Sequence, residues 1–105
     1  MELKEITIED LRKKSEKEDV QVIDIRPSDM FEEEHVHIKA IQNIPLQELP
    51  DHLDQLKKDQ TIYTLCNRGN SSKQAAVFLQ MNGFDATSIK EGTMGWKEKY
   101  PNEVH

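Results

Sequence analysis

The chain has 105 residues, of which 35% are hydrophobic and 32% charged, and its formal net charge at pH 7 is −6. A chain of this length and composition predicts one domain over residues 1–105, with apolar residues sufficient for one modest core. The negative charge argues against a nucleic-acid partner and against attraction to anionic membranes.

The first half of the chain alternates between helix and strand signals. Thr7 precedes two acidic residues, which is typical of the start of a helix. Pro27 ends an almost continuously apolar run, as expected for a strand covered on both faces, and Ser28 is a candidate N-cap. These signals predict a helix over 7–17, a strand over 20–25, a short acidic helix over 28–34 and an edge strand over 43–46.

The second half continues the alternation. Pro50 is favoured as a first helical residue, and Ser71 or Ser72 is a candidate cap for a helix that stops at Gly83. Such alternation predicts an α/β fold, with a central parallel sheet of four or five strands and helices on both faces. The expected elements are a helix from residue 50, a strand over 61–65, a helix over 71–82, a strand over 86–89 and a short helix after Gly92 that holds Trp96.

Cys66 is the single cysteine, and it directly follows the predicted strand over residues 61–65. Functional sites in parallel sheets gather at the carboxyl ends of strands. The loop after Cys66 is built of glycine and small polar residues and leads into a helix, so its amides and the helix N-terminus can stabilise a thiolate or an anion bonded to it. The alternative is a buried, inert core cysteine, which has no need of such a loop.

The loop resembles the active-site loop of rhodanese domains, especially that of bacterial single-domain thiosulfate sulfurtransferases. Four more segments resemble family motifs in the same order: residues 24–26, residues 37–45, residues 83–84 and residues 92–96. The sequence departs from the family at Val36, Ala40 and Glu91, which stand in place of glycines, and at Asn67, which stands in place of an arginine. The loop itself is Cys66, Asn67, Arg68, Gly69, Asn70, Ser71, Ser72 and Lys73.

The resemblance implies a sulfur-transfer reaction with no metal or organic cofactor. The Cys66 thiolate would attack the outer sulfur of a donor such as thiosulfate, release sulfite and become a persulfide. A thiol, cyanide or a protein cysteine would then take the sulfur. The resemblance also implies that the seven residues after Cys66 bind the substrate. The residue types agree, because Gly69 lets the backbone turn its amides inward, Ser71 and Ser72 offer hydroxyls, and Arg68 and Lys73 offer positive charge.

Several other polar residues are expected to be structural. Asp24 and Arg26 end a strand beside the loop, and we expect them to form an ion pair that supports the site without performing the chemistry. His35 and His37 have a spacing that metal sites use, but neither a cysteine nor a suitable carboxylate accompanies them, so we expect no metal. Trp96 is expected to be a core or rim aromatic and not a platform for the substrate.

Two other functions compete with sulfur transfer. One is a non-catalytic or sensing rhodanese module that binds a partner protein. The other is a phosphatase, which needs Cys-x5-Arg to hold a phosphoryl group, whereas Ser72 stands at the arginine position. The charged N-terminal residues lack the apolar core of a signal peptide, so we expect a cytoplasmic protein in which Cys66 is a free thiol.

Overall fold

A five-stranded sheet organises the computed structural model, which describes residues 2–105. All neighbouring strands are parallel, in the order β1-β5-β4-β2-β3, so β4 occupies the centre. This confirms the predicted α/β fold with its parallel sheet. The strands are β1 (Glu5–Ile6), β2 (Gln21–Asp24), β3 (Ile41–Asn43), β4 (Ile62–Leu65) and β5 (Ala86–Ile89).

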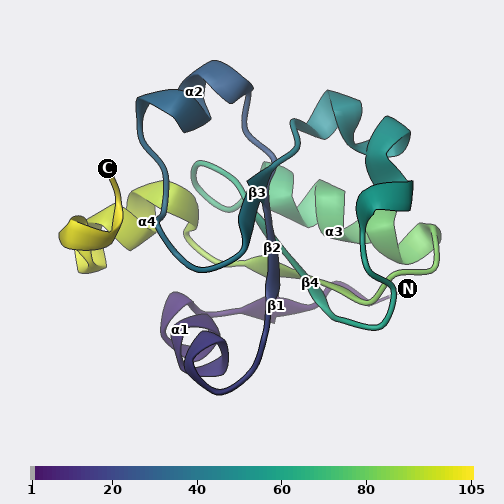
Figure 1. Cartoon of the computed structure of the whole chain (residues 1–105), viewed down its shortest axis with the longest axis horizontal. Coiled ribbons are helices and arrows are strands. Elements are labelled where there is room, and N and C mark those ends of the chain that lie inside the picture. Colours follow the sequence, from purple (N-terminus) through teal and green to yellow (C-terminus); the bar gives the residue numbers. More distant parts are fainter. Residues whose placement is uncertain (1) are drawn as a thin grey trace.

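Helices cover the sheet on both faces, as predicted. In Figure 1, α3 and the η1 segment lie on one side of the strands, and α1 and α4 lie on the other. The Thr7 side chain accepts a hydrogen bond from the Asp10 amide at 3.1 Å, which confirms the predicted cap of α1. The helices are α1 (Ile8–Lys17), α2 (Ser28–Glu33), η1 (Leu46–Gln55, 3-10), α3 (Ser71–Met81), α4 (Gly92–Lys99) and η2 (Pro101–Glu103, 3-10).

The core has two parts, one on each face of the sheet. Ile23 of β2 joins the part under η1 and α3, whereas its neighbour Val22 joins the part under α1 and α4. Both faces are buried, which explains why the strand sequence is almost continuously apolar. Trp96 is fully buried, as predicted. Within residues 2–105, no helix has the length and apolar character needed to cross a bilayer.

Several predicted boundaries are wrong because tertiary contacts set them. The edge strand covers residues 41–43 and not 43–46, and the next helix begins at Leu46, with Pro50 inside it. The Leu46 amide donates to the Ile25 carbonyl at 3.0 Å, so a contact with the chain after β2 sets this start. Strand β1 was not predicted, because two residues carry no periodic signal until they pair with β5.

The predicted serine caps are also wrong. Ser28 and Ser71 are the first residues of their helices, and the residues before them, Pro27 and Asn70, make no side-chain capping bond. The Ser72 hydroxyl instead shares a 2.7 Å hydrogen bond with the Ser88 hydroxyl in the core. Ser72 therefore packs α3 onto the sheet.

Glu103 joins three elements through one carboxylate. Arg12 of α1 donates to Glu103 Oε1 at 3.2 Å and to Oε2 at 2.7 Å, and the Trp96 indole donates to Oε1 at 2.8 Å. The Arg12 hydrogen bond, with help from Trp96, lowers the pKa of Glu103 below its ordinary value of 4.5. A carboxylate whose pKa is lowered by folding stabilises the fold above that ordinary value, and the stabilisation is lost as the pH falls through the folded-state pKa.

We expect Glu103→Gln to lower the free energy of unfolding by about 1–2 kcal/mol at pH 7, because the amide keeps the Trp96 bond but loses the charge-assisted pair. The difference from wild type should shrink as the pH falls below 4.5. Urea unfolding at several pH values measures this. Glu98→Gln, on the exposed part of α4, is the control, and an equal loss in both variants would contradict the role of Glu103.

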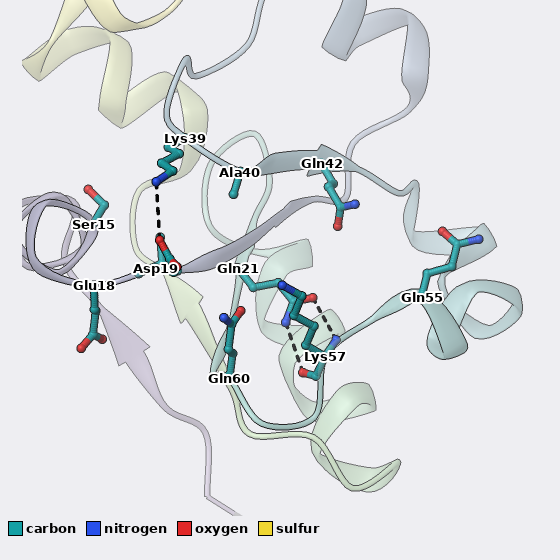
Figure 2. A pocket seen from close by; sticks show the side chains of 11 residues that line it. Ser15, Glu18, Asp19, Gln21, Lys39, Ala40, Gln42, Gln55, Lys57 and Gln60 are labelled. Carbon is teal, nitrogen blue, oxygen red and sulfur yellow. Dashed lines mark hydrogen bonds and ion pairs between the residues drawn. The ribbon is translucent and has the colours of Figure 1, made fainter.

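Two residues that replace family glycines carry a left-handed backbone. Ala40 has φ of 64° and Glu91 has φ of 69°. A Cβ makes this conformation costly by roughly 1 kcal/mol or more, which glycine avoids. Ala40 lines a cavity of about 370 Å³ at the amino-terminal end of β2 (Figure 2). The left-handed backbone at these two non-glycine residues therefore costs some stability.

We expect Ala40→Gly to raise the free energy of unfolding by about 0.5–1 kcal/mol, because relief of the left-handed strain outweighs the added freedom of the unfolded chain. Thermal or urea unfolding measures the change. Lys39→Gly is the neighbouring control, since Lys39 has no positive φ, and it should destabilise the fold. A decrease in stability for Ala40→Gly would show that the strain is absent.

Candidate active site

Cys66 lies at the carboxyl end of the central strand β4, where the chain turns toward α3. Only 4% of the residue is exposed. Its sulfur accepts a hydrogen bond from the Gly69 amide at 3.1 Å. The turn that aims this amide back at the sulfur passes through Gly69 with φ of 96°, a conformation that glycine adopts without strain. The amide favours a negatively charged sulfur.

The first turn of α4 holds the cysteine loop in place through backbone hydrogen bonds. The Thr93 amide donates to the Cys66 carbonyl at 2.8 Å, and the Met94 amide donates to the Asn67 carbonyl at 3.0 Å. Gly92, with φ of 65°, allows this approach, because a Cβ there would lie 2.5 Å from the Asn67 carbonyl carbon and oxygen. The position of the cysteine loop thus depends on a glycine far along the chain.

The predicted ion pair between Asp24 and Arg26 is present and buried. Arg26 Nε donates to Asp24 Oδ1 at 3.0 Å, and Nη2 donates to Oδ2 at 2.9 Å, with residue exposures of 5% and 0%. Arg26 Nη2 also donates to the Glu34 carbonyl at 2.9 Å, across the end of α2. The pair therefore fixes the chain that leaves β2 beside the cysteine loop.

Asn43 is a supporting residue that the sequence reasoning missed. Its amide nitrogen donates to the carbonyls of Asp24 at 3.0 Å and Arg26 at 2.9 Å, so it ties β3 to the turn after β2. Asn43 belongs to one of the resembling segments, and that membership was the available signal.

A cavity of about 490 Å³ opens over Cys66, between α2 and the start of η1. Of the predicted site residues, four line it: Arg26, Cys66, Asn67 and Ser71. The other six do not: Asp24, Arg68, Gly69, Asn70, Ser72 and Lys73. Two carboxylates in its wall, Asp29 and Glu48, were not predicted. The lining residues are Ile25, Arg26, Pro27, Ser28, Asp29, Met30, Pro45, Leu46, Gln47, Glu48, Cys66, Asn67 and Ser71.

Three of the predicted substrate-binding residues lie outside the lining of this cavity. The Ser72 hydroxyl is buried and shares a 2.7 Å hydrogen bond with the Ser88 hydroxyl. Arg68 is exposed, and neither it nor Lys73 lines the cavity. The structure therefore gives the cavity no lysine and no arginine other than Arg26 among the described residues.

Three histidine rings form a stack, and none of them lines the cavity over Cys66. The ring centroids of His35 and His37 are 4.1 Å apart, and those of His37 and His105 are 3.7 Å apart. His37 Nε2 lies 2.7 Å from the His105 carbonyl. These contacts join residues 35–37 to the segment after η2, which agrees with the structural role expected for His37.

The cavity of Figure 2 is a weaker candidate than the one over Cys66. Its polar groups bond to one another: the Gln21 side chain bonds the Lys57 backbone at 3.2 and 3.1 Å, and Lys39 lies 3.6 Å from Asp19. It contains no cysteine or histidine. The cavity over Cys66 is therefore the candidate active site.

Comparison with known proteins identifies the family of the chain. The family model of the rhodanese-like domain matches residues 7–99. The thiosulfate sulfurtransferase GlpE of Shewanella oneidensis is 30% identical over 90% of this chain and 93% of its own length. A rhodanese-like domain protein from Staphylococcus aureus is 29% identical, with a TM-score of 0.82 over 90% of this chain and 91% of that one.

Another relative is longer. YrkF of Bacillus subtilis, which is named as a candidate sulfur carrier protein, is 28% identical over 97 residues. These cover 90% of this chain, which spans about half (51%) of YrkF.

Proposed function

Because this chain belongs to the rhodanese-like domain family, we propose that it is a sulfurtransferase that carries a sulfane sulfur on Cys66 as a persulfide. The observation that supports this most directly is the Gly69 amide, which donates to the sulfur of Cys66 at the edge of a cavity. An amide placed there stabilises a thiolate before the reaction and a persulfide anion after it.

The first half-reaction loads the sulfur. The Cys66 thiolate attacks the outer sulfur of a donor, such as thiosulfate, and a new S–S bond forms to Cys66. The donor's own S–S bond breaks, and sulfite leaves with its electron pair. Charge balances, because a thiolate and a dianion become a persulfide anion and a sulfite dianion. The Gly69 amide, and the N-terminus of α3 beyond it, favour the anionic sulfur throughout.

The second half-reaction returns the thiolate. A thiolate acceptor, such as a small thiol or a protein cysteine, or cyanide, attacks the outer sulfur of the Cys66 persulfide. The S–S bond to Cys66 breaks, and the acceptor leaves with the sulfur. We assign contacts with the reacting sulfur compounds to Asn67 and Ser71, which line the cavity, and not to Arg68 or Lys73. Asp24, Arg26 and Asn43 act as positioning residues for the turn beside the loop.

Intact mass spectrometry tests the proposal. After incubation with thiosulfate or another sulfane-sulfur donor, the chain should gain the mass of one sulfur atom, and a reductant should remove it. Because the chain has a single cysteine, the added sulfur must reside on Cys66. Absence of the added sulfur with all donors would favour a binding or sensing module instead.

We expect no hydrolysis of aryl phosphates, since Ser72 occupies the position of the phosphatase arginine and its hydroxyl is bonded to Ser88. A chromogenic phosphate assay on the wild-type protein measures this. Phosphatase activity that disappears in Cys66→Ser, without persulfide formation, would replace sulfur transfer as the proposed function.

A further inference from the structure

The charges around the Cys66 cavity are opposite to what an anionic donor needs. Three charged residues line it: Arg26, Asp29 and Glu48. Arg26 is held by the buried carboxylate of Asp24, with which it makes hydrogen bonds of 2.9 to 3.1 Å. Its positive charge is therefore already balanced. The two remaining charges of the wall are both negative.

Among residues 2–105, no lysine or arginine forms an ion pair with either carboxylate. Asp29 accepts a hydrogen bond from the Met30 amide at 3.0 Å. Glu48 lies 3.9 Å from His52, and its side chain is 60% exposed. Asp29 belongs to α2 and Glu48 to η1, two segments that both lie in the upper part of Figure 1, where β2 ends. The two acidic residues of the cavity lining thus come from two different segments of the chain.

We propose that Asp29 and Glu48 are specificity-determining residues that make the Cys66 cavity favour neutral or cationic sulfur compounds over anions. The inference rests on the proposed function, and it narrows the substrate class to organic persulfides and thiols with a neutral or basic group beside the sulfur. Thiosulfate, a dianion, is repelled by both carboxylates and by a chain of net charge −6.

The other walls of the cavity suit an organic partner. Pro27, Met30, Pro45 and Leu46 provide apolar surface around the polar groups. A volume of about 490 Å³ lies within the range of about 300–1,000 Å³ that small-molecule sites occupy. Apolar walls offer nothing to a small inorganic dianion, but they contact the carbon atoms of a thiol compound.

A matched pair of thiol reagents tests the charge preference without relying on sulfur transfer. Trimethylammonioethyl and sulfonatoethyl methanethiosulfonate both leave a disulfide on a thiolate and release methanesulfinate, and they differ in charge. Cys66 is the single cysteine, so mass spectrometry follows it alone. For Cys66, the rate of modification by the cationic reagent is divided by the rate of modification by the anionic reagent. This ratio is then divided by the same ratio measured on N-acetylcysteinamide, a free thiol that corrects for the intrinsic reactivities of the two reagents.

We expect this normalised ratio to exceed one for the wild type. In Asp29→Asn/Glu48→Gln it should fall on the order of three- to tenfold at low salt, and less at high salt, because each carboxylate acts through partly screened Coulomb forces. The control Glu16→Gln/Glu98→Gln changes the net charge equally at exposed positions outside the cavity wall, and it should leave the ratio nearly unchanged.

An equal change in both double variants, or no change in either, would overturn the proposal. If the Asp29 change disturbs α2, Glu48→Gln alone serves for the same measurement, because the Glu48 side chain is exposed. Its normalised ratio should also be lower than that of the wild type. A separate arm measures the rate at which thiosulfate loads Cys66, which should rise in Asp29→Asn/Glu48→Gln. A shifted reagent ratio without any persulfide from any donor would retain the charge preference but refute the sulfur-transfer function.

Discussion

Replacing Cys66 with serine is expected to reduce sulfur transfer by at least about a thousandfold, because a hydroxyl is a far weaker nucleophile than a thiolate at neutral pH. Thiosulfate:cyanide transfer and intact mass should both report the loss. The fold should survive, since serine differs little in size and the Gly69 amide can donate to its hydroxyl. Circular dichroism and thermal unfolding check this.

Cys66→Ala provides the matched control for the serine variant. It removes the polar atom altogether, so it separates loss of the nucleophile from any cost of placing a hydroxyl in a site only 4% exposed. Both variants should be inactive while folded. Substantial transfer by either folded variant would remove Cys66 from the mechanism.

Gly92→Ala is expected to have the largest effect on the site of any change outside it. The new Cβ would lie 2.5 Å from the Asn67 carbonyl carbon and oxygen and 2.6 Å from the Arg68 nitrogen, at a φ of 65°. Backbone atoms cannot swing aside as a side chain can, so the cysteine loop or the start of α4 must move. We expect a loss of stability of about 2–4 kcal/mol and at least a tenfold loss of sulfur transfer.

Gly83→Ala separates the steric effect from the backbone strain. Gly83 has φ of 87°, but the nearest atom to a new Cβ is the mobile end of Lys58 at 3.7 Å. This variant should therefore lose only about 1 kcal/mol and keep its activity. If the two variants lost equal stability and equal activity, the close packing of Gly92 against the loop would be refuted.

The elements of the fold that were predicted from the sequence have signals within a few neighbouring residues. Strand β4 is a short apolar run, and the cap of α1 is set by Thr7 and the Asp10 amide three residues later. The cysteine loop could be recognised for the same reason, since the thiol, the glycine and the helix that follows are consecutive. The comparisons confirm the family that this loop and its accompanying motifs indicated.

The elements that were missed depend on partners distant in the sequence. Strand β1 exists through its pairing with β5, and the start of η1 depends on the Ile25 carbonyl. The sequence suggests that the Ser72 hydroxyl belongs to the loop, but in the structure it is hydrogen-bonded to Ser88 of β5 in the core. No local pattern contains these contacts.

The sequence by itself determined the proposed reactive atom and its immediate surroundings, because Cys66, Gly69 and the start of α3 are neighbours along the chain. Only the tertiary structure decided what surrounds that atom on the other sides. The cavity walls come from α2 and η1, whose order along the chain says nothing about which side chains face the sulfur. The cavity lining includes Asp29 and Glu48 and does not include Arg68 or Lys73, so its charged residues differ from those that the loop sequence indicates.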